Sequence, residues 1–158
     1  MSQDFYLGNP NLKKVGTEIQ FTKDQIQEYL RCKEDPVYFA MTYIKIISLD
    51  EGIVPFKMWD FQQQLIESFH EHRFNIAKLP RQTGKSTTCV SYLLHYILFN
   101  DNVNVGILAN KLSTARDLLG RLQLAYEQLP LWIQQGIVVY NKGSMELENG
   151  SKILAAST

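Results

Sequence analysis

One short run of residues combines the residue types that bind phosphate groups. It reads Leu79-Pro80-Arg81-Gln82-Thr83-Gly84-Lys85-Ser86-Thr87. Its end, Gly84-Lys85-Ser86, matches the phosphate-binding pattern G-x-x-x-x-G-K-[ST], although Leu79 stands where the pattern has its first glycine. In this pattern, glycine lets the backbone curl so that successive N–H groups face phosphate oxygens, and the N-terminus of the next helix adds partial positive charge. Lys85 would reach the β- and γ-phosphates of a nucleotide, and the Ser86 hydroxyl would ligate Mg²⁺.

A second basic residue lies inside the same run. Arg81 would sit near the γ-phosphate, where a guanidinium neutralises charge that develops during phosphoryl transfer. The alternative for Arg81 is a surface arginine paired with an acid. The alternative for Lys85 is an ordinary residue in the first turn of a helix, which is unfavourable because a cation there opposes the helix dipole unless an anion neutralises it.

An aromatic residue beside a glutamine, Phe61-Gln62, precedes this run by about one short segment. An aromatic ring can stack on adenine, and a glutamine carboxamide can pair with both N6 and N7 of the base. The pair is therefore a candidate adenine contact. The alternative is that Phe61 and Trp59 simply belong to the core.

The hydrophobic pattern places the run between a strand and a helix. Apolar residues predict a short strand over residues 74–79 and a helix over Lys85–Phe99. A second strand over residues 103–109 and a second long helix over 113–129, stopped at Pro130, follow. Strand, helix, strand and helix at this spacing predict a parallel sheet with right-handed crossovers.

The flanking regions are expected to be helical before the run and mainly extended after it. Residues 1–20 are polar and contain turn residues, which indicates a loose arm. Thr22 or Asp24 can cap a helix that ends by Glu34. The further expected elements are helices over 37–47 and 59–70, strands over 137–140, 145–148 and 152–155, and a hairpin turn at Asn149-Gly150.

Composition limits the class of protein without naming a partner. The 158 residues give a prior of one domain, and 45% of them are apolar, which excludes a wholly disordered chain. Basic and acidic residues number 16 each, so any contact with DNA must use a local patch. The start of the chain lacks the pattern of a signal peptide, which indicates a cytoplasmic protein. Cys32 and Cys89 are then expected to be reduced thiols.

Several segments together resemble the large terminase of contractile-tailed bacteriophages, from about Pro36 to the end of the chain. The segments that carry the resemblance are Phe61-Gln62, the loop Pro80–Ser86, Val105–Ala109 and Asn141–Gly150. The resemblance implies an α/β fold: a P-loop NTPase of the additional-strand catalytic-glutamate type. Its parallel sheet would have flanking helices and a small helical N-terminal subdomain. It also implies an ATPase that drives viral DNA into an empty capsid.

The resemblance assigns roles to individual residues. Lys85 and Ser86 would be the Walker A residues, Arg81 a loop arginine that acts within its own subunit, and Phe61 and Gln62 the adenine-binding pair. The remaining loop residues would complete the site for ATP, with Mg²⁺ on Ser86; they are Gln82, Thr83, Gly84 and Thr87. The implied partners are viral double-stranded DNA, the portal protein, the small terminase subunit and other copies of the chain in a ring. The implied location is the host cytoplasm, at the procapsid.

The sequence departs from the family pattern at its end. A family ATPase continues to an apolar strand that ends in Asp-Glu, whereas no acidic residue follows Glu148 in this chain. We therefore expect a flexible arm and first helix over residues 1–35. Residues 36–158 would be the N-terminal part of an ATPase domain that stops before Walker B, is incomplete at the C-terminus, and lacks the nuclease domain.

Two other functions stay open at this point. A P-loop helicase also places a glutamine upstream of Walker A, although the segments after residue 100 favour the terminase. A non-catalytic fragment that must pair with a separate chain is the third possibility. A sheet without its central strand would expose unpaired edges and apolar surface.

Overall fold

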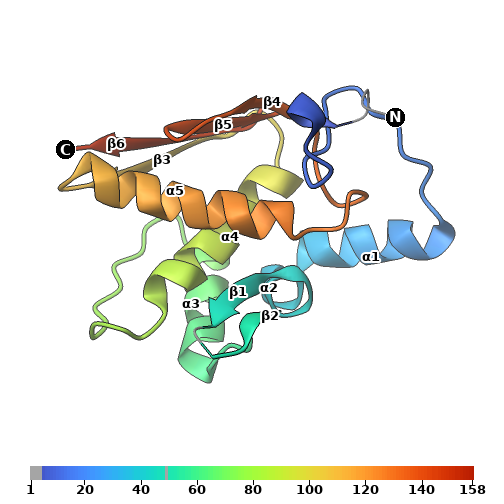
Figure 1. Ribbon diagram of the computed structural model, residues 1–158. Coiled ribbons are helices and arrows are strands. Elements are labelled where there is room, and N and C mark those ends of the chain that lie inside the picture. Colours follow the sequence, from blue (N-terminus) through green and yellow to red (C-terminus); the bar gives the residue numbers. More distant parts are fainter. Residues whose placement is uncertain (1–4, 49) are drawn as a thin grey trace.

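The computed structural model describes residues 5–48 and 50–158, and it shows a mixed α/β arrangement with helices flanking a mixed sheet (Figure 1). The elements in the described part of the chain are the 3-10 helix η1 (Tyr6–Gly8), the helices α1 (Lys23–Glu34), α2 (Pro36–Tyr43), α3 (Asp60–Glu71), α4 (Lys85–Phe99) and α5 (Leu112–Glu127), and the strands β1 (Lys45–Ser48), β2 (Gly52–Pro55), β3 (Asn104–Ala109), β4 (Ile137–Tyr140), β5 (Ser144–Leu147) and β6 (Lys152–Ser157).

The larger sheet has four strands in the order β3-β6-β5-β4. Only β3 and β6 are parallel, in a register that pairs Asn104 with Lys152 and Ala109 with Ser157. The other pairs are antiparallel. The expected Asn149-Gly150 turn reverses the chain between β5 and β6, with Gly150 at a left-handed φ of +80°. The predicted parallel sheet is therefore only partly confirmed.

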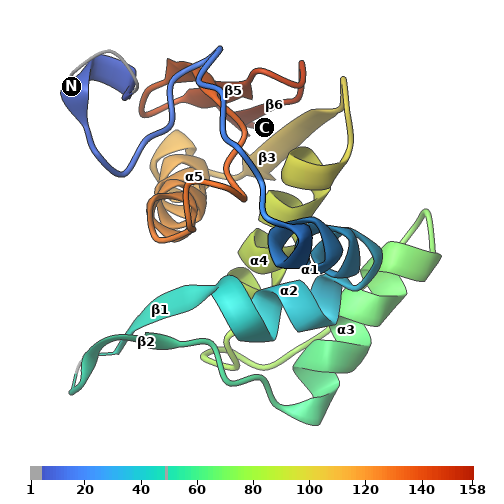
Figure 2. The ribbon, with the colours of Figure 1, turned by 90° about the vertical axis from the view of Figure 1, so that its right-hand side faces the viewer.

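The helices form layers below this sheet. Helix α5 packs against β3 and β6, α4 packs against α5, and α3 and α2 lie against α4 (Figures 1 and 2). Side chains alternate across each strand, so Ile107 and Ile153 are buried toward α5. Leu108 and Leu154 face the opposite side of the sheet and are 65% and 48% exposed.

A buried histidine fixes the far end of α4 to α1. The Nε2 atom of His95 lies 2.8 Å from the carbonyl oxygen of Cys32, and the ring is only 2% exposed. Burial lowers the pKa of His95 to about 4, so the ring is neutral at neutral pH and can donate its N–H to this carbonyl. Tyr38 and Tyr43 of the α2 segment donate their hydroxyls to the Glu28 carboxylate at 2.7 and 2.9 Å, which joins α2 to α1.

Part of the segment expected to be a loose arm packs against the sheet. The N–H of Ile137 donates to the carbonyl of Lys13 at 2.8 Å, and Leu12 is 3% exposed. The Glu148 carboxylate accepts from the backbone N–H groups of Gly16 and Gly136 at 3.1 and 2.7 Å. These long-range contacts cover the outer edge of β4. Residues 1–4 lie outside the described part of the chain.

Two predicted elements are wrong. The helix expected over residues 37–47 ends at Tyr43, because Lys45–Ser48 pairs instead with β2 in an antiparallel hairpin. Residues 74–79 do not form the predicted strand, because no strand of the described residues pairs with them. The side chains of Phe74 and Ile76 are 82% and 102% exposed.

Among the described residues, no helix has both the length and the apolar character needed to span a bilayer. Cys32 and Cys89 are both free thiols, the first buried and the second partly buried.

Candidate functional site

The phosphate-loop sequence lies at the N-terminus of α4. Gly84 is the N-cap of this helix and adopts a left-handed conformation, with φ 71° and ψ 11°. Gln82 is also left-handed, with φ 62°, which is uncommon for a residue other than glycine. The first helical hydrogen bond runs from the N–H of Thr88 to the carbonyl of Gly84. The N–H groups of the first three helical residues therefore have no acceptor within the helix, and they are free to face an anion.

Lys85 bends back over the loop. Its ammonium donates to the carbonyl oxygens of Leu79 and Pro80, each at 3.3 Å. Thr83 adds a further internal contact, because its hydroxyl donates to the Pro80 carbonyl at 3.0 Å. Neither of the ion pairs between described residues includes Lys85. Its positive charge therefore stays available to a phosphate group at the helix N-terminus.

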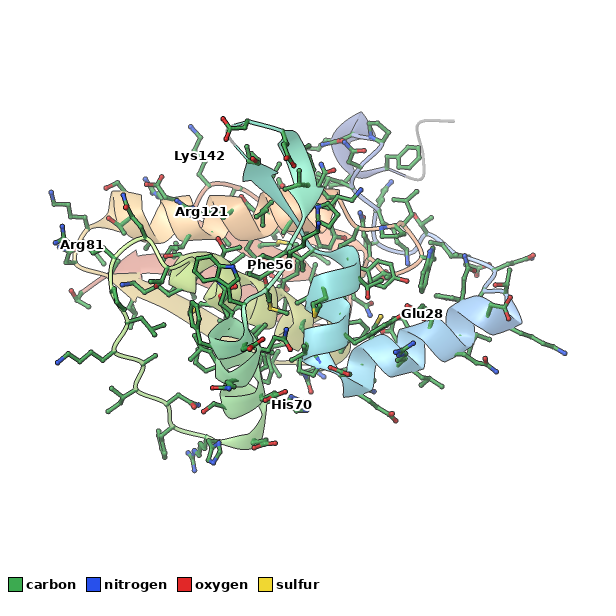
Figure 3. The ribbon with its side chains drawn as sticks, turned by 90° about the horizontal axis from the view of Figure 1, so that it is seen from below. Glu28, Phe56, His70, Arg81, Arg121 and Lys142 are labelled. Atoms are coloured by element: carbon green, nitrogen blue, oxygen red, sulfur yellow. The ribbon has the colours of Figure 1, made fainter. Side chains whose placement is uncertain are left out.

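Arg81 lies in the same loop but points outward, at the periphery of the molecule (Figure 3). It is exposed, and neither of the ion pairs in the described part of the chain involves it. The alternative of a surface arginine held by an acid therefore finds no acidic partner among these residues. Its charge adds to that of Lys85 on the loop side of the molecule.

Ser86 is the second residue of α4 and is half-buried. No hydrogen bond engages its hydroxyl within the described residues, so that oxygen can serve as a ligand. The same residues hold no group of three or more histidine, cysteine and acidic side chains that could bind a metal ion. Mg²⁺ usually takes one or two carboxylates, phosphate oxygens and water. Among the described residues of the loop, the Ser86 hydroxyl would be the ligand from the protein, and the phosphates would supply others.

Gln62 joins α3 to the phosphate loop. Its Nε2 donates to the carbonyl oxygen of Thr83 at 3.1 Å, and its Oε1 accepts from the N–H of Trp59 at 3.0 Å. The residue is 5% exposed. The sequence indicated that Gln62 belongs to the site but not that it touches the loop. The signal was its place at the third position of a helix, where a glutamine turns back to the residue before the helix.

Phe61 is half-buried beside this contact, and its ring is tilted against that of Trp59, with the centroids 5.7 Å apart. Trp59 is 64% exposed. The alternative that both rings belong to the core therefore fails for Trp59, whose face remains open to solvent next to the loop-binding end of α3. Contact of Phe61 and Gln62 with adenine stays a prediction.

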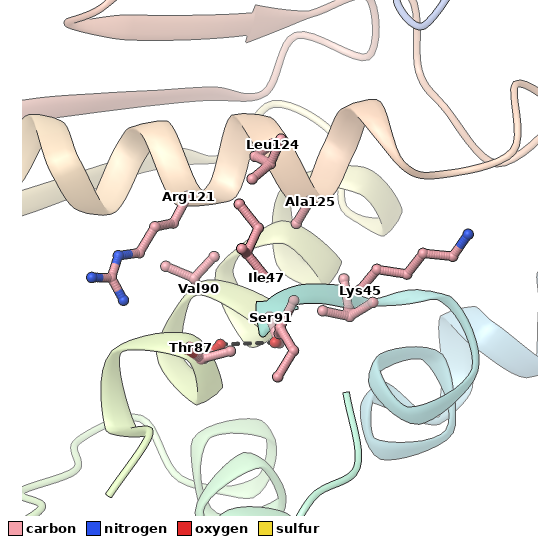
Figure 4. A pocket seen from close by; sticks show the side chains of 10 residues that line it. Lys45, Ile47, Thr87, Val90, Ser91, Arg121, Leu124 and Ala125 are labelled. Carbon is pink, nitrogen blue, oxygen red and sulfur yellow. Dashed lines mark hydrogen bonds between the residues drawn. The ribbon is translucent and has the colours of Figure 1, made fainter. Parts of the chain in front are cut away.

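A cavity of about 370 Å³ opens beside the first turns of α4 (Figure 4). Thr87, Val90 and Ser91 line it from α4, with β1 and α5 forming the other walls. Lys45 and Arg121 lie at opposite ends of its rim (Figure 4). Sequence reasoning missed this cavity, because β1 was expected to be helical and the hairpin brings residues from distant parts of the chain together.

Cys89 lies one turn after the loop and lines a smaller cavity with Lys85 and Ser86. Burial raises the pKa of its thiol. The thiol is therefore neutral at neutral pH and is a poor nucleophile. Cys89 therefore contributes to packing beside the loop and not to nucleophilic chemistry.

A groove separates the extended segment before the loop from the free edge of β3. One cavity of about 690 Å³ is lined by Asn75 and by residues 104–106, and another of about 190 Å³ by Ala77, Leu79 and Ile107. Both also touch Cys89 and Leu93 of α4. In the described part of the chain, β3 pairs on one side only, with β6. The groove thus runs between two unpaired backbones, over the apolar side of α4.

No model of a known protein family matches the sequence.

Proposed function

We propose that this chain is the ATP-binding segment of a viral DNA-packaging motor, which couples ATP hydrolysis to movement of phage DNA into a procapsid. The observation that carries the proposal is the geometry at the start of α4. A left-handed glycine caps the helix, and a lysine with no carboxylate partner among the described residues follows it. A lysine here repels the helix dipole unless an anion binds, and a triphosphate supplies that anion.

Each loop residue has a role in this proposal. The Lys85 ammonium leaves the carbonyls of Leu79 and Pro80 to bind the β- and γ-phosphates. Arg81 neutralises charge on the transferred phosphoryl group, and the backbone of Gln82, Thr83, Gly84 and Thr87 lines the phosphates. Mg²⁺, held by Ser86 and phosphate oxygens, would offset the charge of the triphosphate. Phe61 would stack on the adenine.

The assignment to a packaging motor, rather than to another ATPase, rests on the resemblance to large terminases. Val105–Ala109 and Asn141–Gly150 carry it beyond the phosphate loop. A P-loop helicase shares the upstream glutamine but not these segments. In a packaging motor the partners would be viral double-stranded DNA, the portal protein, the small terminase subunit and further copies in a ring, at the procapsid in the host cytoplasm.

A second candidate function is that of a fragment completed by strands from outside the described residues. The groove between residues 74–79 and β3 favours it. Phe74 and Ile76 are almost fully exposed. The backbone of residues 74–79 pairs with no strand of the described residues. Strands added in this groove would pair both backbones. We therefore expect the 158-residue chain to bind ATP but to hydrolyse it poorly.

Calorimetric titration of the chain with ATP and Mg²⁺ tests the first proposal. We expect Lys85→Ala to abolish binding, because it removes the cation that meets the phosphates. Lys78→Ala is the matched control, since Lys78 is an exposed lysine of the segment before the loop. Circular dichroism shows whether each variant stays folded. Equal ATP affinity for wild type and a folded Lys85→Ala would rule out a phosphate loop at this position.

A further inference from the structure

Gln62 contacts the phosphate loop from a different element, and both ends of its carboxamide are bonded to backbone. The Oε1 atom accepts from the N–H of Trp59 and the Nε2 atom donates to the carbonyl of Thr83. The first bond fixes the carboxamide on the N-terminus of α3. The second bond then holds the carbonyl of Thr83, 21 residues further along the chain, against this carboxamide.

The contact with Thr83 determines how the next peptide group is oriented. The peptide between Thr83 and Gly84 is planar, and a trans peptide points its C=O and N–H in opposite directions. Because the carbonyl of Thr83 points toward Gln62, the N–H of Gly84 points away from α3. That N–H adjoins the N–H groups of Lys85 and Ser86 at the start of α4, where the proposed function places the phosphates.

The packing around Gly84 shows how closely the glutamine approaches. A Cβ atom on Gly84 would lie 2.6 Å from Nε2 of Gln62. The left-handed φ of +71° at the same residue is also one that a side chain disfavours. Two features therefore favour glycine at position 84: the left-handed backbone conformation and the close approach of the Gln62 side chain.

We propose that Gln62 is a positioning residue: it holds the Thr83–Gly84 peptide in the orientation that binds phosphate. This inference rests on the proposed function and deepens it. It differs from a role in reading adenine, because a positioning residue affects every ligand that carries the phosphates, whether or not the ligand has a base.

The variant Gln62→Glu tests this role with little change in shape. Its carboxylate still accepts from the N–H of Trp59 but presents a second acceptor to the carbonyl of Thr83. At pH 8 we expect the affinity for ATP and for inorganic tripolyphosphate to fall by the same factor, about tenfold. Protonation of the carboxyl restores a donor, so the loss should shrink between about pH 7 and pH 5, since burial raises a glutamate pKa above about 4.3.

Gln64→Glu is the matched control, because it makes the same charge change on an exposed face of α3. Each variant is compared with wild type at the same pH, so that titration of the ligands cancels. Equal losses for both ligands, relieved by acid in Gln62→Glu alone, would support the inference. A loss for ATP without a loss for tripolyphosphate would overturn it in favour of a base contact.

Two further outcomes separate failure of this inference from failure of the proposed function. Unchanged affinity of a folded Gln62→Glu would also overturn the inference while leaving the proposed function intact. Failure of wild type to bind either ligand would overturn the proposed function, and with it this inference.

A measurement without any ligand covers the case in which Gln62→Glu is too unstable for titration at pH 8. The backbone amide resonance of Gly84 should move in the variant even at pH 5.5 to 6, where part of the carboxyl is ionised. The amide of Gly120, which is exposed on α5, should stay in place. An unmoved Gly84 amide would contradict the proposed contact.

Discussion

The phosphate loop and the segment that leads into it are neighbours in sequence but differ in what holds them. The loop is fixed by Gln62 from α3 and by contacts of its own, such as Lys85 to the Leu79 carbonyl. Residues 74–79 form neither helix nor strand, and no strand of the described residues pairs with them. The loop thus keeps a defined shape although the segment before it lacks the sheet that would normally support a strand.

The difference shows which parts of the candidate site are held locally. The left-handed Gly84 N-cap and the bond from Gln62 of the upstream helix hold the loop. Residues 74–79 have no strand beside them among the described residues. We therefore expect that binding of an anion at the loop does not depend on strands beside residues 74–79.

Gly84→Ala should give the largest effect on ATP affinity, because it changes the loop itself. The new Cβ strains the left-handed φ and pushes Nε2 of Gln62 off the Thr83 carbonyl. We expect the free energy of unfolding to fall by about 1–2 kcal/mol and ATP affinity to fall at least about tenfold. Chemical denaturation and calorimetric titration measure the two quantities.

Gly120→Ala is the matched control for that substitution. Gly120 lies in α5 with no atom within 4 Å of its would-be Cβ. It should raise the free energy of unfolding by about 0.5–1 kcal/mol and leave ATP affinity unchanged. A loss of ATP affinity as large as that of Gly84→Ala would show that the effect is not specific to the loop.

The buried His95 near the C-terminal end of α4 should make the free energy of unfolding depend on pH. The pKa of His95 is lowered to about 4 by burial, whereas an unfolded histidine titrates near 6.5. The unfolded state then binds more protons between these pH values, so the free energy of unfolding falls as the pH drops from about 6.5 to about 4. We expect His95 to contribute up to about 3 kcal/mol to this loss.

Denaturation curves of wild type, His95→Gln and His72→Gln across this pH range measure that contribution. The variant at the buried site should have a flatter pH dependence than wild type, even if it is less stable overall. The variant at His72, which is exposed, should follow wild type. A wild-type slope in His95→Gln would contradict the assignment.

The smallest effect on stability is expected in the unpaired segment. Phe74→Asp combined with Ile76→Asp replaces two exposed side chains, so the free energy of unfolding should change by less than about 0.5 kcal/mol. Light scattering should show less self-association, because the apolar patch is lost. A large loss of stability would mean that these side chains are buried.

Ile47→Asp combined with Ile53→Asp is the control for self-association. These residues are 63% and 53% exposed on the β1–β2 hairpin. If they reduce association as strongly as the changes at Phe74 and Ile76, residues 74–79 are not its specific source. That result would remove the main support for the second candidate function.

The sequence predicted the elements whose signals are local. Thr22 caps α1 as expected, with its hydroxyl accepting from the Gln25 N–H, and α4 begins and ends where the pattern placed it. Long-range pairing decided the failures. Residues 45–48 have an apolar run that fits a helix but pair with β2, and residues 74–79 have a strand pattern but no strand beside them in the described chain.

The sequence placed the candidate loop residues at the start of a helix but did not give their contacts. The motif placed Gly84, Lys85 and Ser86 at a helix start, which the structure shows. The bond from Gln62 to Thr83 was missed, because the capping pattern predicts the bond of the carboxamide oxygen to the residue before the helix but not what the amide nitrogen contacts. The packing of Leu12 and Glu148 on the sheet was missed because it joins opposite ends of the chain.

The most direct test of the account is a titration of the isotope-labelled chain with tripolyphosphate and then with ATP, followed through the backbone amide resonances. We expect both ligands to move the amides of residues 83–87 most, and ATP alone also to move the signals of Trp59 and Phe61. Unmoved amides of residues 83–87 at saturating ATP, or largest changes elsewhere in the chain, would contradict a phosphate-binding loop at the start of α4.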